Sequence, residues 1–207
     1  MKNWDKRYLA AGTGPDTRLF GDQPCDFLRQ VMARPDLRPA SVLCLADGDG
    51  RNGGWLAEQG MRVTAVEGSA VANEQALGHD RVRGVSVERI TADLAEWTPP
   101  PGRTWDAVVM LYLQCEAEVR HRAAALAAGA LAPGGWFIAE GFAPAGAGGD
   151  SLGPDNPDLL YELTDLLDVL DGLDIVEALK GRILLNEGTR HRGEARIARL
   201  LLRRPGP

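Results

Sequence analysis

The sequence predicts an α/β fold, a doubly wound and mostly parallel sheet with helices on both faces. Short apolar or β-branched runs alternate with longer polar or helical stretches over most of the 207 residues. Near the carboxyl end, two strand-like runs follow one another with only a turn between them, so they should pair antiparallel. The expected architecture is therefore a set of parallel units closed by one antiparallel hairpin.

Five runs carry the predicted parallel strands. In chain order they are "SVLCLA", "RVTAV", "VSVERIT", "WDAVVML" and "GWFIAE". Between the fourth and fifth runs, "EAEVRHRAAALAAGAL" repeats apolar positions at helical spacing, which predicts a helix. Each strand, helix and strand unit should cross over with the right-handed connection that parallel sheets prefer.

The last third of the chain predicts one helix and the hairpin. "DNPDLLYELTDLLDVLDG" should form a helix that Asn156 caps, Pro157 opens and Gly172 ends. "LDIVEALKGRILLNEG" and "GEARIARLLLRRP" are the two hairpin strands. The low-complexity segment 141–157 follows the fifth strand and should be a flexible loop, either a flap over a site or a plain surface loop.

Length and composition predict a single domain, residues 1–207, in the cytoplasm. No apolar run reaches the ~18 residues that cross a bilayer, and the start lacks the apolar core of a secretory signal. The net charge of −6, from 29 acidic and 23 basic residues, disfavours nucleic acid as a partner. The three cysteines and three histidines show no metal-ligand spacing, so we expect no metal.

A glycine-rich turn after the first strand predicts a nucleotide cofactor. Residues 48–53 formally match GxGxxG, and Glu67 lies about where an acid grips a ribose, which together would suit a small NAD(P)-binding oxidoreductase. Asp47 and Asp49, however, would lie close to the pyrophosphate of a dinucleotide. S-adenosylmethionine (SAM) has no phosphate and carries a cationic methionine end. The charge of the loop therefore favours SAM.

The order and spacing of these motifs resemble a class I SAM-dependent methyltransferase (EC 2.1.1.-). They are similar to the small bacterial group related to the tellurite-resistance (TehB-like) and thiopurine methyltransferases. "NWDKRY" and "LFGDQPCDFL" resemble the group's amino-terminal cap, "VLCLADGDGRNGGWLAEQG" its first motif and "RVTAVEGS" its ribose-binding strand. "ITADLAEW", "WDAVVMLYL", "LAPGGWFIAEG" and "EGTRHRGEARIARLLLRRP" resemble its adenine motif, fourth strand, fifth strand and closing hairpin.

The resemblance implies a Rossmann-like sheet of seven strands in the order 3-2-1-4-5-7-6 with the last strand antiparallel. It places a cap at residues 1–40 and the core at 41–207. It implies SAM as cofactor, S-adenosylhomocysteine as product and a small molecule as methyl acceptor. The implied cofactor-binding residues form the glycine loop, the ribose site, the adenine site and the end of the fourth strand: Ala46, Asp47, Gly48, Gly50, Asn52, Glu67, Gly68, Ser69, Asp93, Leu94 and Leu111.

Two residues of the first motif depart from the common pattern. The family usually has an acid at the position of Cys44 and a glycine at the position of Ala46. Without that acid, packing and backbone hydrogen bonds must hold the loop. The methyl group of Ala46 is tolerable where its φ is negative.

Candidates for contact with the acceptor are few. Tyr112 follows the fourth strand, His191 lies in the hairpin turn, and Tyr8 could form part of an aromatic lid. No catalytic base can be assigned, because a soft acceptor such as a thiolate, selenium or tellurium species needs none, whereas an oxygen or nitrogen acceptor often does. A SAM-binding protein without catalysis is the second alternative to the methyltransferase. The oligomeric state, monomer or homodimer, and the acceptor stay open.

Overall fold

A computed structural model describes residues 2–12, 18–144, 152–188 and 190–206. Residues 145–151 of the predicted flexible loop 141–157 lie outside the described residues, as does Thr189 of the hairpin turn. Among the described residues, no helix is long and apolar enough to cross a membrane.

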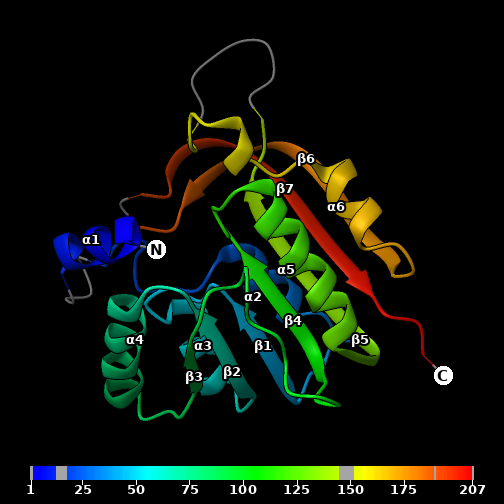
Figure 1. The fold of residues 1–207 in the computed structure, drawn as a ribbon, viewed down its shortest axis with the longest axis horizontal. Helices are drawn as coiled ribbons and strands as arrows, with labels where there is room; N and C mark the ends of the chain where they lie inside the picture. The colour runs from blue at the N-terminus through cyan, green and yellow to red at the C-terminus, as the bar shows by residue number, and fades with distance from the viewer. Residues whose placement is uncertain (1, 13–17, 145–151, 189, 207) are drawn as a thin grey trace. The chain divides into compact units, whose positions relative to one another are not determined.

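The predicted sheet is confirmed. Seven strands lie in the order β3-β2-β1-β4-β5-β7-β6, and β7 (Arg192–Arg203) runs antiparallel to both β5 (Leu131–Phe142) and β6 (Asp174–Asn186). The closing hairpin thus forms as the adjacent strand-like runs predicted (Figure 1). The chain divides into two compact units, a first unit of residues 1–97 with 187–191 and a second unit of residues 98–186 with 192–207. That the whole chain acts as one domain stays a prediction.

The first unit holds three parallel strands and four helices. Its strands are β1 (Ser41–Leu45), β2 (Arg62–Glu67) and β3 (Glu88–Thr91), and β2 pairs in parallel with both others. Its helices are α1 (Lys2–Ala11), α2 (Asp26–Met32), α3 (Arg51–Glu58) and α4 (Ala70–Arg83). Helix α1 packs against α4 through the cluster of Tyr8, Leu19 and Ala72 (Figure 1). The predicted cap therefore lies in the same compact unit as the glycine loop.

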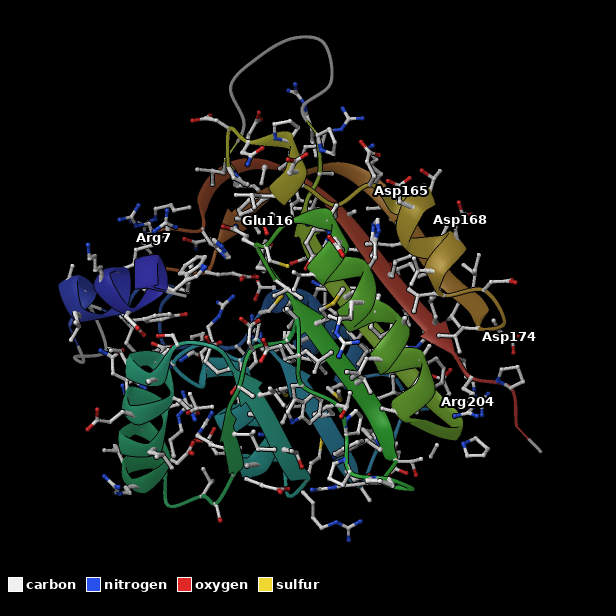
Figure 2. The ribbon with its side chains drawn as sticks, viewed as in Figure 1. Arg7, Glu116, Asp165, Asp168, Asp174 and Arg204 are labelled. Carbon is white, nitrogen blue, oxygen red and sulfur yellow. The ribbon has the colours of Figure 1, made fainter. Side chains whose placement is uncertain are left out.

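The second unit is built on β4 (Trp105–Leu111), the long strand β5 and the β6–β7 hairpin. Helix α5 (Ala117–Ala130) packs along β4 and β5 (Figure 1). Most of its buried residues are alanines. Such small side chains let the helix approach the sheet closely. The short helix α6 (Leu163–Val169) buries Leu166, while Asp165 and Asp168 stand on its outer side (Figure 2).

The single helix predicted over residues 155–172 is wrong. A one-turn 3₁₀ helix at Pro157–Leu159, which Asn156 caps through the Asp158 N–H, is separated from α6 by extended backbone. Tertiary contacts override the local helical pattern. The N–H of Tyr161 donates to the Phe142 carbonyl at 2.7 Å, and the buried Arg120 guanidinium donates to the Leu160 carbonyl at 2.7 Å.

Candidate functional site

The turn after β1 adopts a left-handed backbone at three positions. The φ angles are 57° at Ala46, 60° at Gly48 and 83° at Gly50. The negative φ that would make the alanine tolerable is therefore contradicted. The Ala46 N–H still donates to the Val66 carbonyl at 2.8 Å, so the chain must turn away from the sheet directly after this last ladder bond. A non-glycine residue in this region costs about 1–2 kcal/mol.

Asp47 ties the turn together from inside the first unit. Its carboxylate accepts from the Gly53 N–H at 2.9 Å and from Arg89 Nη1 at 3.0 Å, with both side chains buried. Arg89 also forms an ion pair with Asp80 on α4, at 2.6 Å. Burial raises the pKa of Asp47, while the Arg89 guanidinium acts in the opposite direction. These contacts hold the loop in the absence of an acid at Cys44, which is buried in β1.

Asp49 is also neutralised within the protein. Its carboxylate accepts from Arg18 Nε at 2.9 Å, and Arg18 Nη2 donates to the Asp49 carbonyl at 3.1 Å. Both side chains are almost fully buried, at 2% and 4% exposure. The negative charge that we expected the loop to present to a ligand is thus largely compensated, and this argument for SAM over a dinucleotide loses most of its force.

Each glycine of the loop avoids a specific neighbour. A Cβ at Gly48 would lie 2.5 Å from the Tyr8 hydroxyl, a Cβ at Gly50 would meet the Arg89 guanidinium and Ala76, and a Cβ at Gly53 would meet the Asp47 carboxylate. The GxGxxG match is therefore explained by the packing of the loop, with Gly48 the position that is covered by α1.

Glu67, the last residue of β2, is the acid that faces the glycine loop. Its Oε2 accepts from the Gly48 N–H at 2.8 Å and its Oε1 from the Ser69 N–H at 2.7 Å. The residue is 8% exposed, and burial raises the pKa of its carboxyl against the lowering effect of the backbone donors at Ser69 and Gly48. The carboxylate and the loop are thus joined directly, with both oxygens held in fixed positions for accepting hydrogen bonds.

The remaining predicted cofactor residues of the first unit lie on three elements. Asn52 on α3 accepts from the Cys25 N–H at 2.8 Å, so its side chain fixes the start of α2. Ser69 caps α4 and donates to Asp5 of α1 at 2.5 Å, next to Gly68. Asp93 accepts from the Ala95 N–H at 3.0 Å and stays half-buried, followed by the buried Leu94. Their contact with a cofactor stays a prediction.

Tyr8 lies over the loop. It is 5% exposed, its ring centroid is 6.2 Å from that of Trp4, and burial, followed by the charge of Glu67, raises the pKa of its hydroxyl. Two hydrogen bonds fix α1 on α4. The Asp5 carboxylate accepts from the Val71 N–H, and the Gln75 side chain donates to the Tyr8 carbonyl. Tyr8 is thus positioned as the predicted aromatic cover of the glycine loop.

His191 is buried at 1% exposure and is no exposed turn residue. Its Nδ1 is 3.6 Å from Glu187, and its ring packs on Phe20 with centroids 5.0 Å apart. Glu187 also pairs with Arg51 at 3.1 Å and accepts from the Asp26 N–H at 2.8 Å. The hairpin turn therefore anchors α2 and α3 of the first unit.

Leu111 and Tyr112 lie in the second unit, at the end of β4. Leu111 is buried at 7% exposure and pairs in register with Glu140 of β5. Tyr112 directly follows the strand, with a φ of 53°, and its hydroxyl donates to Glu140 Oε1 at 2.7 Å. The Glu140 carboxylate, fully buried, also forms an ion pair with Arg199 of β7.

Sequence reasoning missed the buried partners that hold these residues: Arg18, Arg89, Arg51, Glu187, Glu140 and Arg199. Their contacts join positions far apart in the chain, such as Arg51 and Glu187, and a single sequence contains no signal for such pairs. The one available hint was a charged residue within a predicted strand, as with Arg89 in "VSVERIT" and Glu140 in "GWFIAE".

Residues 42–135 match a family model described as a methyltransferase domain. This range begins in β1 and ends in β5, so it includes the glycine loop, Glu67, Asp93 and Tyr112. No curated protein sequence matches the chain significantly.

Several solved structures share the fold at low sequence identity. The [4+2]-cyclase SpnF aligns with a TM-score of 0.74 and 18% identity, covering 100% of this chain and 95% of its own. TehB from Haemophilus influenzae aligns at 0.70 and 16%, covering 84% of this chain and 60% of its own. Magnesium protoporphyrin IX methyltransferase from Synechocystis PCC 6803, with bound SAM, aligns at 0.60 and 20%, covering 86% of this chain and 76% of its own.

Proposed function

We propose that this chain is a class I SAM-dependent methyltransferase that methylates a small-molecule acceptor, which the family match over residues 42–135 and the strand order support. SAM supplies an electrophilic methyl group on a sulfonium that is already an excellent leaving group. The protein's own contribution is then to bind and align donor and acceptor and to exclude water.

The pairing of Glu67 with the glycine loop is the observation that carries this proposal. A carboxylate at the end of β2 has both oxygens in place to accept from a ribose diol, and hydrogen bonds fix it to the turn that would receive the methionine part. Glycine is needed at positions 48 and 50 because Tyr8 and Arg89 lie where a side chain would point. The Glu67 carboxylate beside the loop amides is therefore the feature of the first unit that supports SAM as ligand.

The other implied roles follow from the positions of the residues. Asp93 would accept from the adenine amino group with the Leu94 N–H close to the ring, and Leu111 and Tyr112 would lie toward the acceptor. Tyr8 would cover the glycine loop. Because Asn52 and the Asp47 carboxylate are engaged within the protein, we assign their contribution to the shape of the loop.

The NAD(P)-binding oxidoreductase loses its support. The closing antiparallel strand β7 and the methyltransferase domain both point away from it. The GxGxxG match, on which that alternative depended, is explained by side chains that pack against the loop glycines: Tyr8, Ala76, Arg89 and Asp47.

A second candidate function is a methyltransferase fold that does not transfer methyl groups. One observation favours keeping it: SpnF, whose alignment covers 100% of this chain and 95% of its own, is described as a [4+2]-cyclase. Turnover distinguishes the two, because only a methyltransferase converts SAM to S-adenosylhomocysteine in step with methylation of the acceptor.

Small molecules suit the net charge of −6 better than nucleic acid does, because phosphate contacts require basic surface. A cytoplasmic location and a monomeric or homodimeric state stay predictions that accompany this proposal.

The Glu67→Ala variant tests the proposal. We expect SAM affinity, measured by isothermal titration calorimetry, to fall by about 1.5–3 kcal/mol because hydrogen bonds to a charged acceptor are lost. Glu58→Ala is the matched control, since Glu58 pairs with Arg83 at 3.4 Å at the far end of α3 and should leave SAM affinity unchanged. Unchanged SAM affinity in a folded Glu67→Ala protein would refute the assignment.

A further inference from the structure

Tyr112 combines an unusual backbone with a specific position. It is the first residue after β4, and its φ of 53° is left-handed, a conformation that an aromatic residue rarely adopts. Open α/β sheets bind their ligands beyond the carboxyl ends of parallel strands, which is where β4 delivers this residue. Strained backbone of this kind concentrates at functional sites when the surrounding structure enforces it.

The contacts of Tyr112 enforce that conformation. Its N–H donates to the Glu140 carbonyl at 2.6 Å and its hydroxyl to Glu140 Oε1 at 2.7 Å, so one residue of β5 binds both ends of it. The ring also packs edge-on against Phe142, with centroids 5.1 Å apart. Tyr112 is half-buried as a residue, while the carboxylate that its hydroxyl meets is fully buried.

Glu140 is suited to more than a structural role. It is a fully buried carboxylate, and the Arg199 guanidinium offsets its charge. An ionised carboxylate only accepts hydrogen bonds, so the Tyr112 proton must point at Glu140. The lone pairs of the Tyr112 oxygen, which can accept a hydrogen bond, therefore point away from Glu140.

We propose that Tyr112 and Glu140 form a proton relay that makes this enzyme a methyltransferase for acceptors bearing an O–H or N–H group. This inference rests on the proposed function and names the class of its acceptor. The acceptor donates its O–H or N–H to the Tyr112 oxygen, which orients a lone pair of the nucleophile for in-line attack. Tyr112 is then a catalytic residue, and Arg199 is a positioning residue that acts through Glu140.

The step is balanced in atoms and charge. A bond forms between the acceptor's oxygen or nitrogen and the methyl carbon, and the carbon–sulfur bond breaks with its electron pair passing to sulfur. The acceptor's proton moves to the Tyr112 oxygen while the Tyr112 proton moves to Glu140. One positive charge on sulfur and one negative charge on Glu140 disappear together, while the Arg199 guanidinium keeps its charge. After the product leaves, Glu140 returns the proton through Tyr112 to water, which restores the relay.

The test compares four acceptors that share one benzene ring: phenol, benzyl alcohol, aniline and benzenethiol. Benzenethiol is largely deprotonated near neutral pH and needs no relay. The other three probes still carry their O–H or N–H proton at this pH, so a relay can assist their methylation. We measure methylation with methyl-labelled SAM for wild type, Tyr112→Phe and Glu140→Gln. Tyr161→Phe is the control, because it removes the hydroxyl of another tyrosine of the second unit that is buried at 1% exposure.

We expect wild type to methylate at least one O–H or N–H probe. Tyr112→Phe should lower kcat for that probe by about 100-fold, with KM changed little, and should lower benzenethiol turnover far less. Glu140→Gln, which still accepts the Tyr112 hydrogen bond but takes no proton readily, should show the same split. Because Tyr112→Phe keeps the ring packing, it serves as the decisive variant if Glu140→Gln does not fold.

Equal loss on all probes, or no loss on the O–H and N–H probes, would overturn the relay. Methylation of benzenethiol alone, or of none of the four probes, by a wild type that binds SAM would also overturn it. In the case of benzenethiol alone the proposed function would stand, whereas a wild type that does not bind SAM refutes both.

Discussion

Ala46 and Tyr112 share a left-handed backbone conformation and differ in what holds it. Among the described residues they are the two non-glycine residues with a positive φ, and each directly follows a parallel strand, β1 in the first unit and β4 in the second. Ala46 carries only a methyl group, and buried ion pairs of its neighbours hold its turn. Tyr112 carries a phenol that bonds to a buried carboxylate.

This difference shows two origins of the same strain. At Ala46 the conformation is required by the turn into the glycine loop, and the alanine Cβ adds a steric cost that glycine would not have. At Tyr112 the side chain itself is part of the arrangement, because the left-handed residue is bound to Glu140 through both its N–H and its hydroxyl. Relieving the strain should therefore have opposite effects at the two positions.

The largest effect should come from the ion pairs that hold the Ala46 turn. Arg89→Met leaves Asp47 and Asp80 buried without their guanidinium, so the free energy of unfolding should fall by about 3–5 kcal/mol. Urea denaturation measures the loss. Arg34→Met, which breaks the exposed pair with Asp36, should cost less than about 1 kcal/mol. Equal costs for the two variants would show that the buried pairs do not hold the loop.

Tyr112→Gly removes the strain of the second turn together with its contacts. We expect the free energy of unfolding to fall by about 2–4 kcal/mol, because the ring packing on Phe142 is lost and Glu140 loses a hydrogen bond. Chemical denaturation of this variant beside wild type gives the value. A Tyr112→Gly protein that is more stable than wild type would mean that the contacts of the Tyr112 side chain do not compensate for the strain of its backbone.

Glu187 should make the first unit sensitive to acid. Burial raises the pKa of its carboxyl, but the stronger combined effect of His191, Arg51 and the Asp26 N–H lowers it from 4.5 to about 2. Since the folded pKa lies below the unfolded one, the stabilisation is present above pH 4.5 and is lost as the pH falls through about 2. The free energy of unfolding should lose roughly 2–3 kcal/mol over this window.

Glu187→Gln provides the control for this acid sensitivity. The amide does not titrate, so the variant should show a smaller decrease in unfolding free energy between pH 4.5 and pH 2. An identical acid profile in wild type and Glu187→Gln would exclude this carboxylate as the cause.

The smallest effect should be a gain in stability. Ala46→Gly places a glycine where φ is 57° and should raise the free energy of unfolding by about 1 kcal/mol, because the relief of strain exceeds the added entropy of the unfolded chain. Thermal and urea unfolding measure it. A destabilised Ala46→Gly protein would show that the turn holds its alanine without strain.

The sequence predicted the elements of the fold well because their signals are local. Apolar runs gave the five parallel strands, and the absence of a helix between the last two runs gave the hairpin. The helix over 155–172 was wrong, since Tyr161 and Arg120 impose contacts from other elements on that segment. Residues at strand ends, such as Glu67 as the last residue of β2 and Tyr112 directly after β4, could be named as candidates for the same local reason.

The electrostatics of the site could not be predicted. The charges of Asp47 and Asp49 were visible in the chain, but their compensation by Arg89 and Arg18 depends on packing that brings distant residues together. The pairing of Tyr112 with Glu140, on which the acceptor class depends, likewise joins two strands through a parallel register that only the folded sheet defines.

The central claim is tested most directly by titrating the purified protein in parallel with SAM, S-adenosylhomocysteine and NADH in a calorimeter. A SAM-dependent methyltransferase should bind the first two with micromolar affinity, about 8 kcal/mol, and show no heat with NADH. Binding of NADH alone, or of none of the three, would contradict the account.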